Sequence, residues 1–526
     1  MAPDDAALST LIDQHLPEFD KPGVLSIRPG FKIKNDWLTG QRAIVVTVGA
    51  KVAQLPASDR LPTEIDGVPV DVRQASPLKR TEIEDPEAYA AQLHLTPDTG
   101  SVPHFADERT VDGDHPAARA SAHAMLAKVA KTPLPYSAPL DLALRPIDAA
   151  ATIQLSASPD SGWPVLAAFL AGTTESLTVG LYDFTAGHIA TTVETAIAGK
   201  QLKLVLDHPP QNPTADQTDQ ATVAELTQAL GADFTQAWAL TRMDSIANAW
   251  IYPTAYHIKV AVRDRSTVWL SSGNWNNSNQ PDIDPVGKKA DATEARHRDR
   301  DWHVVIEQPQ LAQLFEAYLL NDLTVAGEHN NPAPPLGPPL PAPKTGTTKT
   351  PAFQQFFPSS SVTGTMKIVP LLTPDPGVYV GAVKALIASA TSTLYMQFQY
   401  IELPKQTNAT SQDFVDLVQA VIDRQNAGVD VKIIMSEFEK SGYLEQLQAA
   451  GINVVDNVKI QNNVHNKGVI VDGNAVLVSS QNWSTDGTLY NRDAGVIIHS
   501  DVAAQYFQQI FLHDWQHLAK QKAPAD

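Results

Sequence analysis

After residue 152, the hydrophobic and polar positions follow the same order twice along the chain. The segment 157–185 has a polar Pro-Asp turn, a helix-spaced apolar stretch and a continuous apolar run, and 372–402 repeats that order. A further apolar strand follows each segment, at 200–209 and at 429–439. Strands that alternate with helices at this spacing are typical of an α/β fold. The pattern therefore predicts an α/β protein that contains two repeats.

The segment before the repeats has a different pattern, which predicts a small α+β module. Leucine and isoleucine at helical spacing indicate a helix over 7–16, and apolar runs indicate two strands between 23 and 52 and a third at 67–75. A second helix is expected at 116–131, within a polar stretch that contains several prolines. No residues of this module are arranged for chemistry, so we interpret it as accessory.

Composition marks the boundary between the two repeats. Seven prolines between 332 and 343 should keep the chain extended, and a packed domain could hardly contain them. The predicted organisation has four parts: an N-terminal accessory module at 1–150, a first repeat at 151–326, a Pro-rich linker at 327–365 and a second repeat at 366–526.

Each repeat ends with the same cluster of polar residues. A His is followed by a Lys two residues later, an Asp five residues after the Lys, and then Ser-Ser-x-Asn-Trp. The separation from His to Asn is 17 residues in both copies. Two copies at one spacing, within a repeated unit, are far beyond what chance gives a short motif. The clusters are His257, Lys259, Asp264, Ser272 and Asn274 in the first repeat, and His465, Lys467, Asp472, Ser480 and Asn482 in the second.

The spacing within each cluster predicts a β-hairpin. Residues i and i+2 of a strand face the same side, so each His projects together with its Lys. Turns are expected at Asp472-Gly473, a strong hairpin signal, and at Asp264-Arg265, a weaker one. The returning strand brings the Ser and the Asn back beside the His and the Lys. An imidazole, an ammonium, a hydroxyl and an amide on one face suit a phosphate group.

Charge and composition narrow the possible functions. The net charge is −19, from 39 Lys and Arg against 58 Asp and Glu, which disfavours broad contact with a nucleic acid or an anionic membrane. The chain has no cysteine, which excludes disulfides, thiolate zinc sites, iron–sulfur clusters and thiol nucleophiles. No metal-ligand spacing accompanies the clusters, so we expect no metal and no cofactor. The alternative of a local basic rim is kept for an insertion at 278–299 and its flank. The residues that would form this rim are Lys288, Lys289, Arg296, Arg298 and Arg300.

The first residues are acidic and lack a basic stretch followed by an apolar one, so no signal peptide is expected. No run of 18 or more apolar residues occurs in the sequence. We therefore expect a cytoplasmic protein, with export by another route left open. We also expect the protein to be a monomer.

The two clusters resemble the paired HKD motifs of the phospholipase D superfamily, and the resemblance covers about residues 152–520. Ser271 and Ser479 stand where that family commonly has glycine, while the Ser and Asn of the pattern are kept. The resemblance implies two phospholipase D-like repeats, mixed sheets flanked by helices, that are related by pseudo-twofold symmetry. It also implies a metal-independent phosphodiesterase in which both motifs form one site.

Two further carboxylates fit the family pattern. Asp301 lies 44 residues after the first motif histidine, and Asp493 lies 28 residues after the second. By analogy with the superfamily, each would accept a hydrogen bond from an imidazole nitrogen and fix its tautomer. The alternative is that both are surface acids at strand starts. The motif carboxylates Asp264 and Asp472 are expected to stabilise the hairpin turns rather than to touch substrate.

The resemblance also implies a mechanism. His257 would attack phosphorus to form a phosphohistidine, and His465 would act as acid and then as base. The two lysines and two asparagines would stabilise charge on the non-bridging oxygens, and Ser272 and Ser480 would bind the substrate.

The substrate is expected to be a phospholipid whose headgroup is released or exchanged, with transient contact at a membrane surface. A nuclease that acts on DNA or RNA is the alternative. A non-catalytic phosphate-binding scaffold is a third interpretation, which the two intact motifs disfavour.

Overall fold

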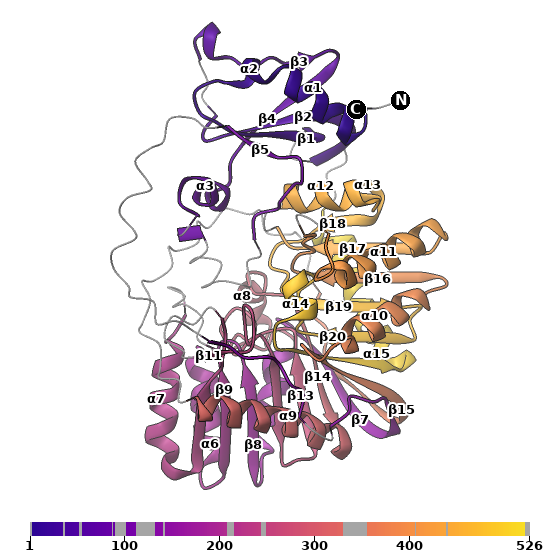
Figure 1. Cartoon of the computed structure of the whole chain (residues 1–526). Helices are drawn as coiled ribbons and strands as arrows, with labels where there is room; N and C mark the ends of the chain where they lie inside the picture. Colours follow the sequence, from indigo (N-terminus) through magenta and orange to yellow (C-terminus); the bar gives the residue numbers. More distant parts are fainter. Residues whose placement is uncertain are drawn as a thin grey trace, which may run out of the picture.

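Two long strands, β7 (Ile147–Ser158) and β15 (Ser360–Thr373), join the repeats in the computed structural model of the chain. They pair antiparallel over nine positions, from Ser360 opposite Leu155 to Ile368 opposite Ile147. Figure 1 shows the first repeat in magenta below and the second in orange and yellow to the right. The structure describes residues 3–34, 37–51, 55–86, 88–89, 101–111, 132–139, 142–207, 215–242, 249–329, 355–404, 407–437 and 440–520.

The two repeats contain matching series of strands and helices. In the first repeat these are α5 (Gly162–Ala171), β8 (Ser176–Leu181), α6 (Gly187–Ile197), β9 (Gln201–Leu206), α7 (Asp219–Leu230), β10 (Phe234–Trp238), β12 (Lys259–Arg263), β13 (Thr267–Ser271), α8 (Ala292–Ala295), β14 (Asp301–Glu307) and α9 (Pro309–Glu328). In the second repeat they are α10 (Val378–Ala388), β16 (Thr393–Phe398), α11 (Gln412–Asn426), β17 (Asp430–Met435), α12 (Lys440–Ala450), α13 (Val454–Asn457), β18 (Val458–Ile460), β19 (Lys467–Val471), β20 (Ala475–Ser479), α14 (Thr485–Leu489), β21 (Asp493–His499) and α15 (Asp501–His513).

Apart from the short β11, the strands of both repeats belong to one 14-stranded sheet with a symmetric order. From one edge to the other the order is β10-β9-β8-β12-β13-β14-β7-β15-β21-β20-β19-β16-β17-β18. The β7–β15 pair lies at the centre, and every strand has a counterpart at the same distance on the other side. The outer strands are parallel and the inner ones antiparallel, which makes each half a mixed sheet. The expected α/β class and mixed sheets flanked by helices are confirmed.

The repeat boundaries differ from the expected ones by a few residues. β7 begins at Ile147, before the expected start of the first repeat at 151. α9 ends at Glu328 and β15 begins at Ser360, so both enter the expected linker range 327–365. Most of that linker lies outside the described residues, as does the helix expected at 116–131.

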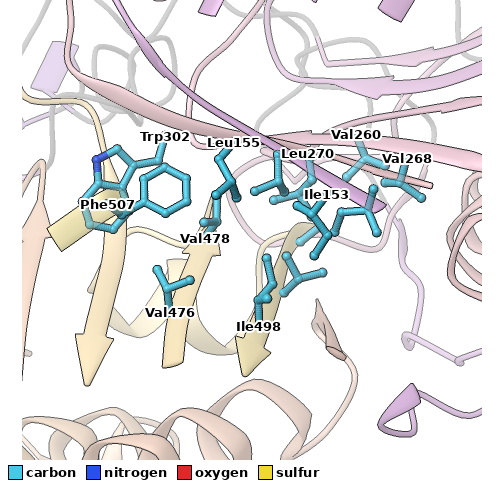
Figure 2. Close-up of a cluster of buried hydrophobic side chains, with 14 of the residues drawn as sticks. Ile153, Leu155, Val260, Val268, Leu270, Trp302, Val476, Val478, Ile498 and Phe507 are labelled. Carbon is cyan, nitrogen blue, oxygen red and sulfur yellow. The ribbon is translucent and has the colours of Figure 1, made fainter. Parts of the chain in front are cut away.

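One hydrophobic core extends across both repeats. It contains strand residues of each half, and it includes Trp302 of β14 stacked on Phe507 of α15 with ring centroids 4.8 Å apart. Because apolar side chains of both halves leave water together, neither half buries this surface alone. Figure 2 shows part of this core: Ile153, Leu155, Val260, Val268, Leu270 and Trp302 from the first repeat, and Val476, Val478, Ile498 and Phe507 from the second.

The N-terminal module forms a separate five-stranded sheet in the order β3-β4-β2-β1-β5, drawn in indigo at the top of Figure 1. A buried hydrophobic cluster that includes Ile12, Phe19, Ile27 and Ile44 forms its own small core. Its elements are α1 (Asp5–Gln14), α2 (Leu16–Phe19), β1 (Val24–Lys34), β2 (Trp37–Val48), β3 (Glu64–Ile65), β4 (Val68–Gln74), α3 (Pro77–Glu84) and β5 (Arg109–Thr110). A short pair, β6 (Thr132–Pro133) and β11 (Ala249–Trp250), connects the following segment to the first repeat.

The module contacts the second repeat at α12. Glu445 of that helix accepts hydrogen bonds from Arg28 at 2.5 Å and from Arg73 at 2.7 Å, and its side chain is 1% exposed. Burial would raise the pKa of Glu445, but Arg28 and Arg73 outweigh it and lower the pKa to about 2. This carboxylate is therefore ionised and fixed between two guanidinium groups. No helix among the described residues is long and apolar enough to cross a membrane.

Candidate active site

The two motif clusters form two equivalent hairpins, β12–β13 and β19–β20. Both central residues of each turn have positive φ, at Asp264 and Arg265 and at Asp472 and Gly473. Two residues with φ > 0 define the type I′ geometry that matches the twist of paired strands, and Asp tolerates this conformation better than most residues. The hairpin turns expected at these positions are present.

The carboxylates of Asp264 and Asp472 bind the loop in front of the neighbouring strand. Asp472 accepts hydrogen bonds from the backbone N–H groups of Thr391, Ser392 and Thr393 at 2.8 to 2.9 Å. Asp264 accepts the equivalent hydrogen bonds from the backbone N–H groups of Thr174, Glu175 and Ser176. Burial would raise both pKa values, but these backbone hydrogen bonds leave them below the ordinary range. The two aspartates lie at the turn ends of the hairpins, while the histidines precede the opposite ends.

Each motif histidine is held by a carboxylate of the opposite repeat. The Nδ1 atom of His465 lies 2.9 Å from Oδ1 of Asp301, and Nδ1 of His257 lies 2.8 Å from Oδ1 of Asp493. These four side chains are at most 7% exposed. When Nδ1–H donates to a carboxylate, Nε2 is the nitrogen that can attack or carry a transferable proton. The exchange of carboxylates therefore sets the same tautomer in both rings and makes each half incomplete alone.

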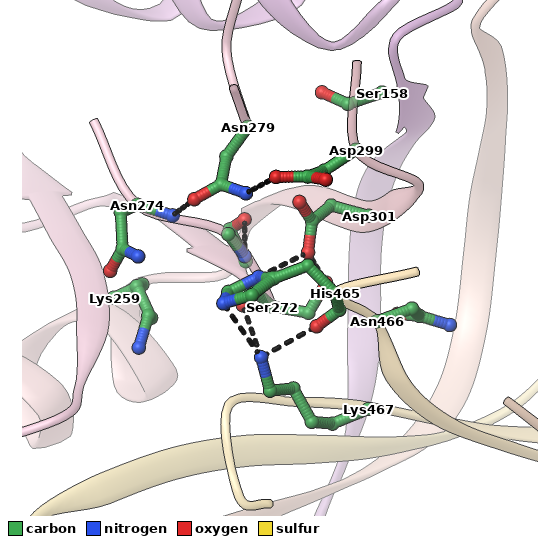
Figure 3. A network of polar contacts seen from close by, with 12 residues as sticks. Ser158, Lys259, Ser272, Asn274, Asn279, Asp299, Asp301, His465, Asn466 and Lys467 are labelled. Carbon is green, nitrogen blue, oxygen red and sulfur yellow. Dashed lines mark hydrogen bonds and ion pairs between the residues drawn. The ribbon is translucent and has the colours of Figure 1, made fainter. Parts of the chain in front are cut away.

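Asp301 is ionised in this arrangement. Burial would raise its pKa, but His465, and Lys467 after it, outweigh that effect and hold the pKa below the ordinary value. An ionised carboxylate at Nδ1 stabilises the imidazolium that forms when Nε2 takes up a proton. Figure 3 shows this contact together with the contacts of Lys467.

The motif lysines are fully buried beside their histidines. Nζ of Lys467 lies 3.0 Å from Nε2 of His465 and 3.4 Å from the carbonyl oxygen of Ser272, which belongs to the first repeat. Nζ of Lys259 donates to the carbonyl oxygen of His257 at 2.7 Å. Two buried ammonium groups next to two imidazoles form a positive site that suits a phosphate anion.

The structure places Ser272 and Ser480 differently from the substrate contact expected of them. Ser272 Oγ donates to Asp301 at 2.7 Å, and Ser480 Oγ donates to Asp493 at 2.5 Å. Each hydroxyl thus holds the carboxylate that holds the histidine of the opposite repeat. We assign both serines as positioning residues, because their donor hydrogens are already used.

The two motif asparagines lie buried near the same hairpin ends. The backbone N–H of Asn274 donates to Asn279 Oδ1 at 2.9 Å, which fixes the segment after β13 (Figure 3). Asn482 is 4% exposed, and its Oδ1 has no hydrogen-bond partner among the described residues. An unpaired buried amide oxygen costs free energy, so it marks a place where a ligand group can bind.

Two buried arginines lie directly before the orienting carboxylates, and sequence reasoning missed their role. Arg300 donates to Asp160 at 2.8 Å and to Asp514 at 2.9 Å, and it is 2% exposed, so it does not belong to the expected basic rim. Arg492 donates to Asp322 at 2.6 Å. Asp514 follows α15, the last helix of the second repeat, and Asp322 lies in α9, the last helix of the first repeat. Each arginine therefore pairs with a carboxylate of the opposite repeat, as each motif histidine does. The sequence signal for this role was the Arg-Asp dipeptide that occurs in both repeats, at 300–301 and at 492–493.

The remaining histidine near the first motif has a structural place. His303 is fully buried between Ser158 at 2.8 Å from Nε2 and Ser271 at 2.7 Å from Nδ1. Burial lowers the pKa of His303 to about 4, so it stays neutral at ordinary pH. Both ring nitrogens of His303 are therefore engaged in hydrogen bonds within the protein core.

A pocket of about 180 Å³ opens beside His257 and Asn482. Further residues that line it are Ser101, Thr254, Tyr400, Glu402, Asp486 and Asn491. Among the residues that the structure describes, no group of three or more His, Asp or Glu side chains could hold a metal ion.

Comparison with known proteins gives a match to a protein family. Residues 383–515, which contain the second motif, match the family model described as cardiolipin synthase, PLD-like domain. Over 103 residues the chain is 32% identical to the mitochondrial cardiolipin hydrolase of Xenopus tropicalis. That segment is 19% of this chain and spans only 49% of the length of the relative.

The solved structures that match parts of this chain include two bacterial proteins. The phosphatidylserine synthase of Haemophilus influenzae matches 70% of this chain and 86% of its own, with 14% identity and a TM-score of 0.46. Nuc of Salmonella typhimurium, a phospholipase D family member, matches 30% of this chain and 97% of its own, with 19% identity and a TM-score of 0.24. The family match covers the second of the two equivalent hairpins, so that part of the chain is similar to a PLD-like domain.

Proposed function

We propose that this protein is a phosphodiesterase of the phospholipase D type that cleaves or transfers the headgroup ester of a phospholipid through a phosphohistidine intermediate. The observation that carries the proposal is the exchange of carboxylates, Asp493 to His257 and Asp301 to His465. Two imidazoles with the same tautomer, in a site that also holds two ammonium groups, supply both an attacking nitrogen and a proton donor for one phosphate.

The first step forms a nitrogen–phosphorus bond. Nε2 of neutral His257 attacks phosphorus, and the bond from phosphorus to the departing oxygen breaks. Protonated His465 donates its Nε2 proton to that oxygen, so the alcohol leaves neutral. Lys259 and Lys467 stabilise the charge that accumulates on the non-bridging oxygens.

The second step restores the enzyme. Neutral His465 takes a proton from water or from another alcohol, whose oxygen attacks phosphorus while the bond to His257 breaks. Only the state with one neutral and one protonated imidazole is productive, because one ring attacks while the other donates a proton. Hydrolysis and headgroup exchange therefore differ only in the incoming oxygen.

The intermediate gives the test of this proposal. The protein is mixed with bis(p-nitrophenyl) phosphate in EDTA, quenched in base and digested, and the histidine that carries the p-nitrophenyl phosphoryl group is located by mass spectrometry. We expect the phosphoryl group on His257 and its absence from His257→Ala, while the exposed His499→Ala behaves as wild type. Phosphate on His465, or activity that EDTA abolishes and a divalent metal restores, would contradict the proposal.

A nuclease is the second candidate, favoured by the exposed pair Lys288 and Lys289 within the insertion at 278–299. The rest of the basic rim is weaker than expected, because Arg300 is buried and Arg298 pairs with Glu294. Release of choline from phosphatidylcholine vesicles and degradation of single-stranded DNA, both measured in EDTA, separate the two candidates.

A further inference from the structure

The two repeats differ in charge at one position beside the motif histidines. Residues 299–301 read Asp-Arg-Asp, and residues 491–493 read Asn-Arg-Asp. The arginine of each triplet forms a parallel bridge with the residue directly before the motif histidine of the opposite repeat. The last residue of each triplet is the aspartate that holds Nδ1 of that histidine. The two triplets are therefore equivalent in place, and they differ in side chain only at Asp299 and Asn491.

The first triplet runs directly beside the second motif histidine. The backbone N–H of Arg300 donates to the carbonyl oxygen of Asn463 at 2.7 Å, and the backbone N–H of His465 donates to that of Arg300 at 3.1 Å. Side chains two residues apart in an extended segment project to the same side. Figure 3 shows Asp299 and Asp301 on the same side of the His465 ring. Two carboxylates of one short segment therefore lie beside this imidazole.

The electrostatic environment of Asp299 includes His465. Burial is the largest effect on the pKa of Asp299 and raises it, while His465 is the strongest effect that lowers it. Nδ2 of Asn279 donates to Oδ2 of Asp299 at 3.0 Å, a contact that favours the ionised carboxylate (Figure 3). Coupling between two groups is reciprocal, so an ionised Asp299 stabilises the protonated form of His465.

Asn491 occupies the equivalent place beside His257 without a charge. Its Oδ1 accepts hydrogen bonds from the backbone N–H of Ala255 at 3.2 Å and from the hydroxyl of Thr254. A side-chain amide has nearly the shape of a carboxylate but is neutral. The triplets therefore provide two carboxylates beside His465 and one beside His257.

The other charged groups do not cancel this difference. Lysine lies beside each histidine, and His303 stays neutral because burial lowers its pKa to about 4. Burial raises the pKa of Glu402 to about 8, so this side chain is largely protonated at pH 7. Glu437 on one side and Asp486 on the other leave Asp299 as the unmatched charge among the residues that the structure describes. The titratable groups compared are Lys467, His303 and Glu437 near His465, and Lys259, Tyr182, Glu402 and Asp486 near His257.

We propose that Asp299 assigns the roles of the two histidines, because its carboxylate keeps the proton of the singly protonated pair on His465 and leaves His257 neutral. This inference rests on the proposed function and adds the reason why one of two equivalent rings attacks phosphorus. Asp299 acts through His465 rather than on the substrate, so we assign it as a positioning residue.

Titration of the two rings, followed by nitrogen NMR of histidine-labelled protein without substrate, tests the proposal directly. We expect Asp299→Asn to lower the titration midpoint of His465 by about one pH unit, the lower end of the effect of a nearby opposite charge. Asn491→Asp adds a charge on the other side and should raise the midpoint of His257 by a similar amount. It provides a second test if the first variant does not fold.

The doubly exchanged variant, Asp299→Asn with Asn491→Asp, gives a second measurement. Both variant side chains keep the shape of the original ones, but the unmatched charge moves to the other histidine. After reaction with bis(p-nitrophenyl) phosphate, we expect a large part of the p-nitrophenyl phosphoryl group on His465, whereas wild type carries it on His257. A merely structural role of Asp299 would not move the label.

The control is Asp282→Asn, which removes an exposed carboxylate of the same insertion that accepts a hydrogen bond from Trp163 at 2.9 Å. This variant should keep the wild-type midpoints. An unchanged midpoint of His465 in a folded Asp299→Asn, or a doubly exchanged variant labelled on His257 alone, would overturn the inference. A wild type that shows no labelled histidine at all would instead overturn the proposed function.

Discussion

At the scale of single residues, the site depends on which atom of each histidine is engaged. The Nδ1 atoms of His257 and His465 are bound to aspartates, and serine hydroxyls in turn hold those aspartates. This chain of hydrogen bonds runs Ser272–Asp301–His465 and Ser480–Asp493–His257. The two chains orient both reactive nitrogens by contacts that do not touch the substrate.

Asp301→Asn tests the carboxylate that holds Nδ1 of His465. The amide can still accept a hydrogen bond from Nδ1, but it cannot stabilise an imidazolium, so we expect kcat to fall by about 10²- to 10⁴-fold. Steady-state kinetics on a soluble phosphodiester, with circular dichroism to confirm folding, provide the measurement. A variant with kcat within twofold of wild type would show that Asp301 has no part in proton transfer.

Ser272→Ala distinguishes a positioning role from substrate binding. Loss of one hydrogen bond to Asp301 should lower kcat by about tenfold and leave KM nearly unchanged, because the serine acts through the aspartate. Ser480→Ala should behave in the same way. A rise in KM with unchanged kcat would indicate that the hydroxyl binds substrate, as the motif first suggested.

At the scale of elements, the hairpins carry the motif residues and the aspartates of their turns secure the hairpins. Asp472→Ala removes an acceptor for three backbone N–H groups, so we expect the free energy of unfolding to fall by about 1–3 kcal/mol while kcat stays at the wild-type value. The pKa of Asp472 is lowered in the folded protein. The contribution of this carboxylate to the free energy of unfolding is therefore complete above pH 3.8, the ordinary pKa value, and is lost as the pH falls below that value.

Denaturant unfolding at pH 7 and in acid, alongside activity at pH 7, checks this prediction. The exposed Asp501→Asn serves as a control carboxylate outside the turns. A large loss of activity in a stable Asp472→Ala would mean that the aspartate acts in the chemistry.

Sequence patterns could predict the hairpins and most helices and strands, because the apolar positions repeat at regular spacing. They could not reveal that β7 and β15 form the centre of the sheet, since the first half of each strand alternates between exposed and half-buried positions and contains few large apolar residues. The family resemblance suggested Asp301 and Asp493 as orienting carboxylates, but it did not indicate that each contacts the histidine of the opposite repeat. Spacing within one repeat holds no information about contact with the other. Arg300 looked like a surface residue for the same reason, because the two carboxylates that allow its burial are 140 and 214 residues away in sequence.

At the scale of the whole molecule, the N-terminal module is fixed to the second repeat by a buried ion cluster. Glu445→Gln would leave Arg28 buried without its counter-charge and Arg73 with Asp71 alone, so we expect stability to fall by about 3 kcal/mol at pH 7. Since the pKa of Glu445 is lowered to about 2, its contribution is complete above the ordinary value of 4.5 and disappears as pH falls toward 2.

The difference in unfolding free energy between wild type and Glu445→Gln, measured from pH 7 down to pH 3, should therefore shrink in acid. Limited proteolysis should also release the module sooner in the variant, with Glu307→Gln as the matched control. Equal stability of the two proteins at pH 7 would show that the ion cluster does not hold the module.

The central claim is that both repeats contribute to one active site, and a double-mutant cycle tests it most directly. The kcat for bis(p-nitrophenyl) phosphate is measured for His257→Ala, His465→Ala and the double variant. In a shared site each imidazole depends on the other, so we expect each single change to lower kcat by about 10³-fold or more, and the double change to cost little beyond that. Two independent sites would instead leave about half of the wild-type kcat in each single variant, and that result would contradict the account.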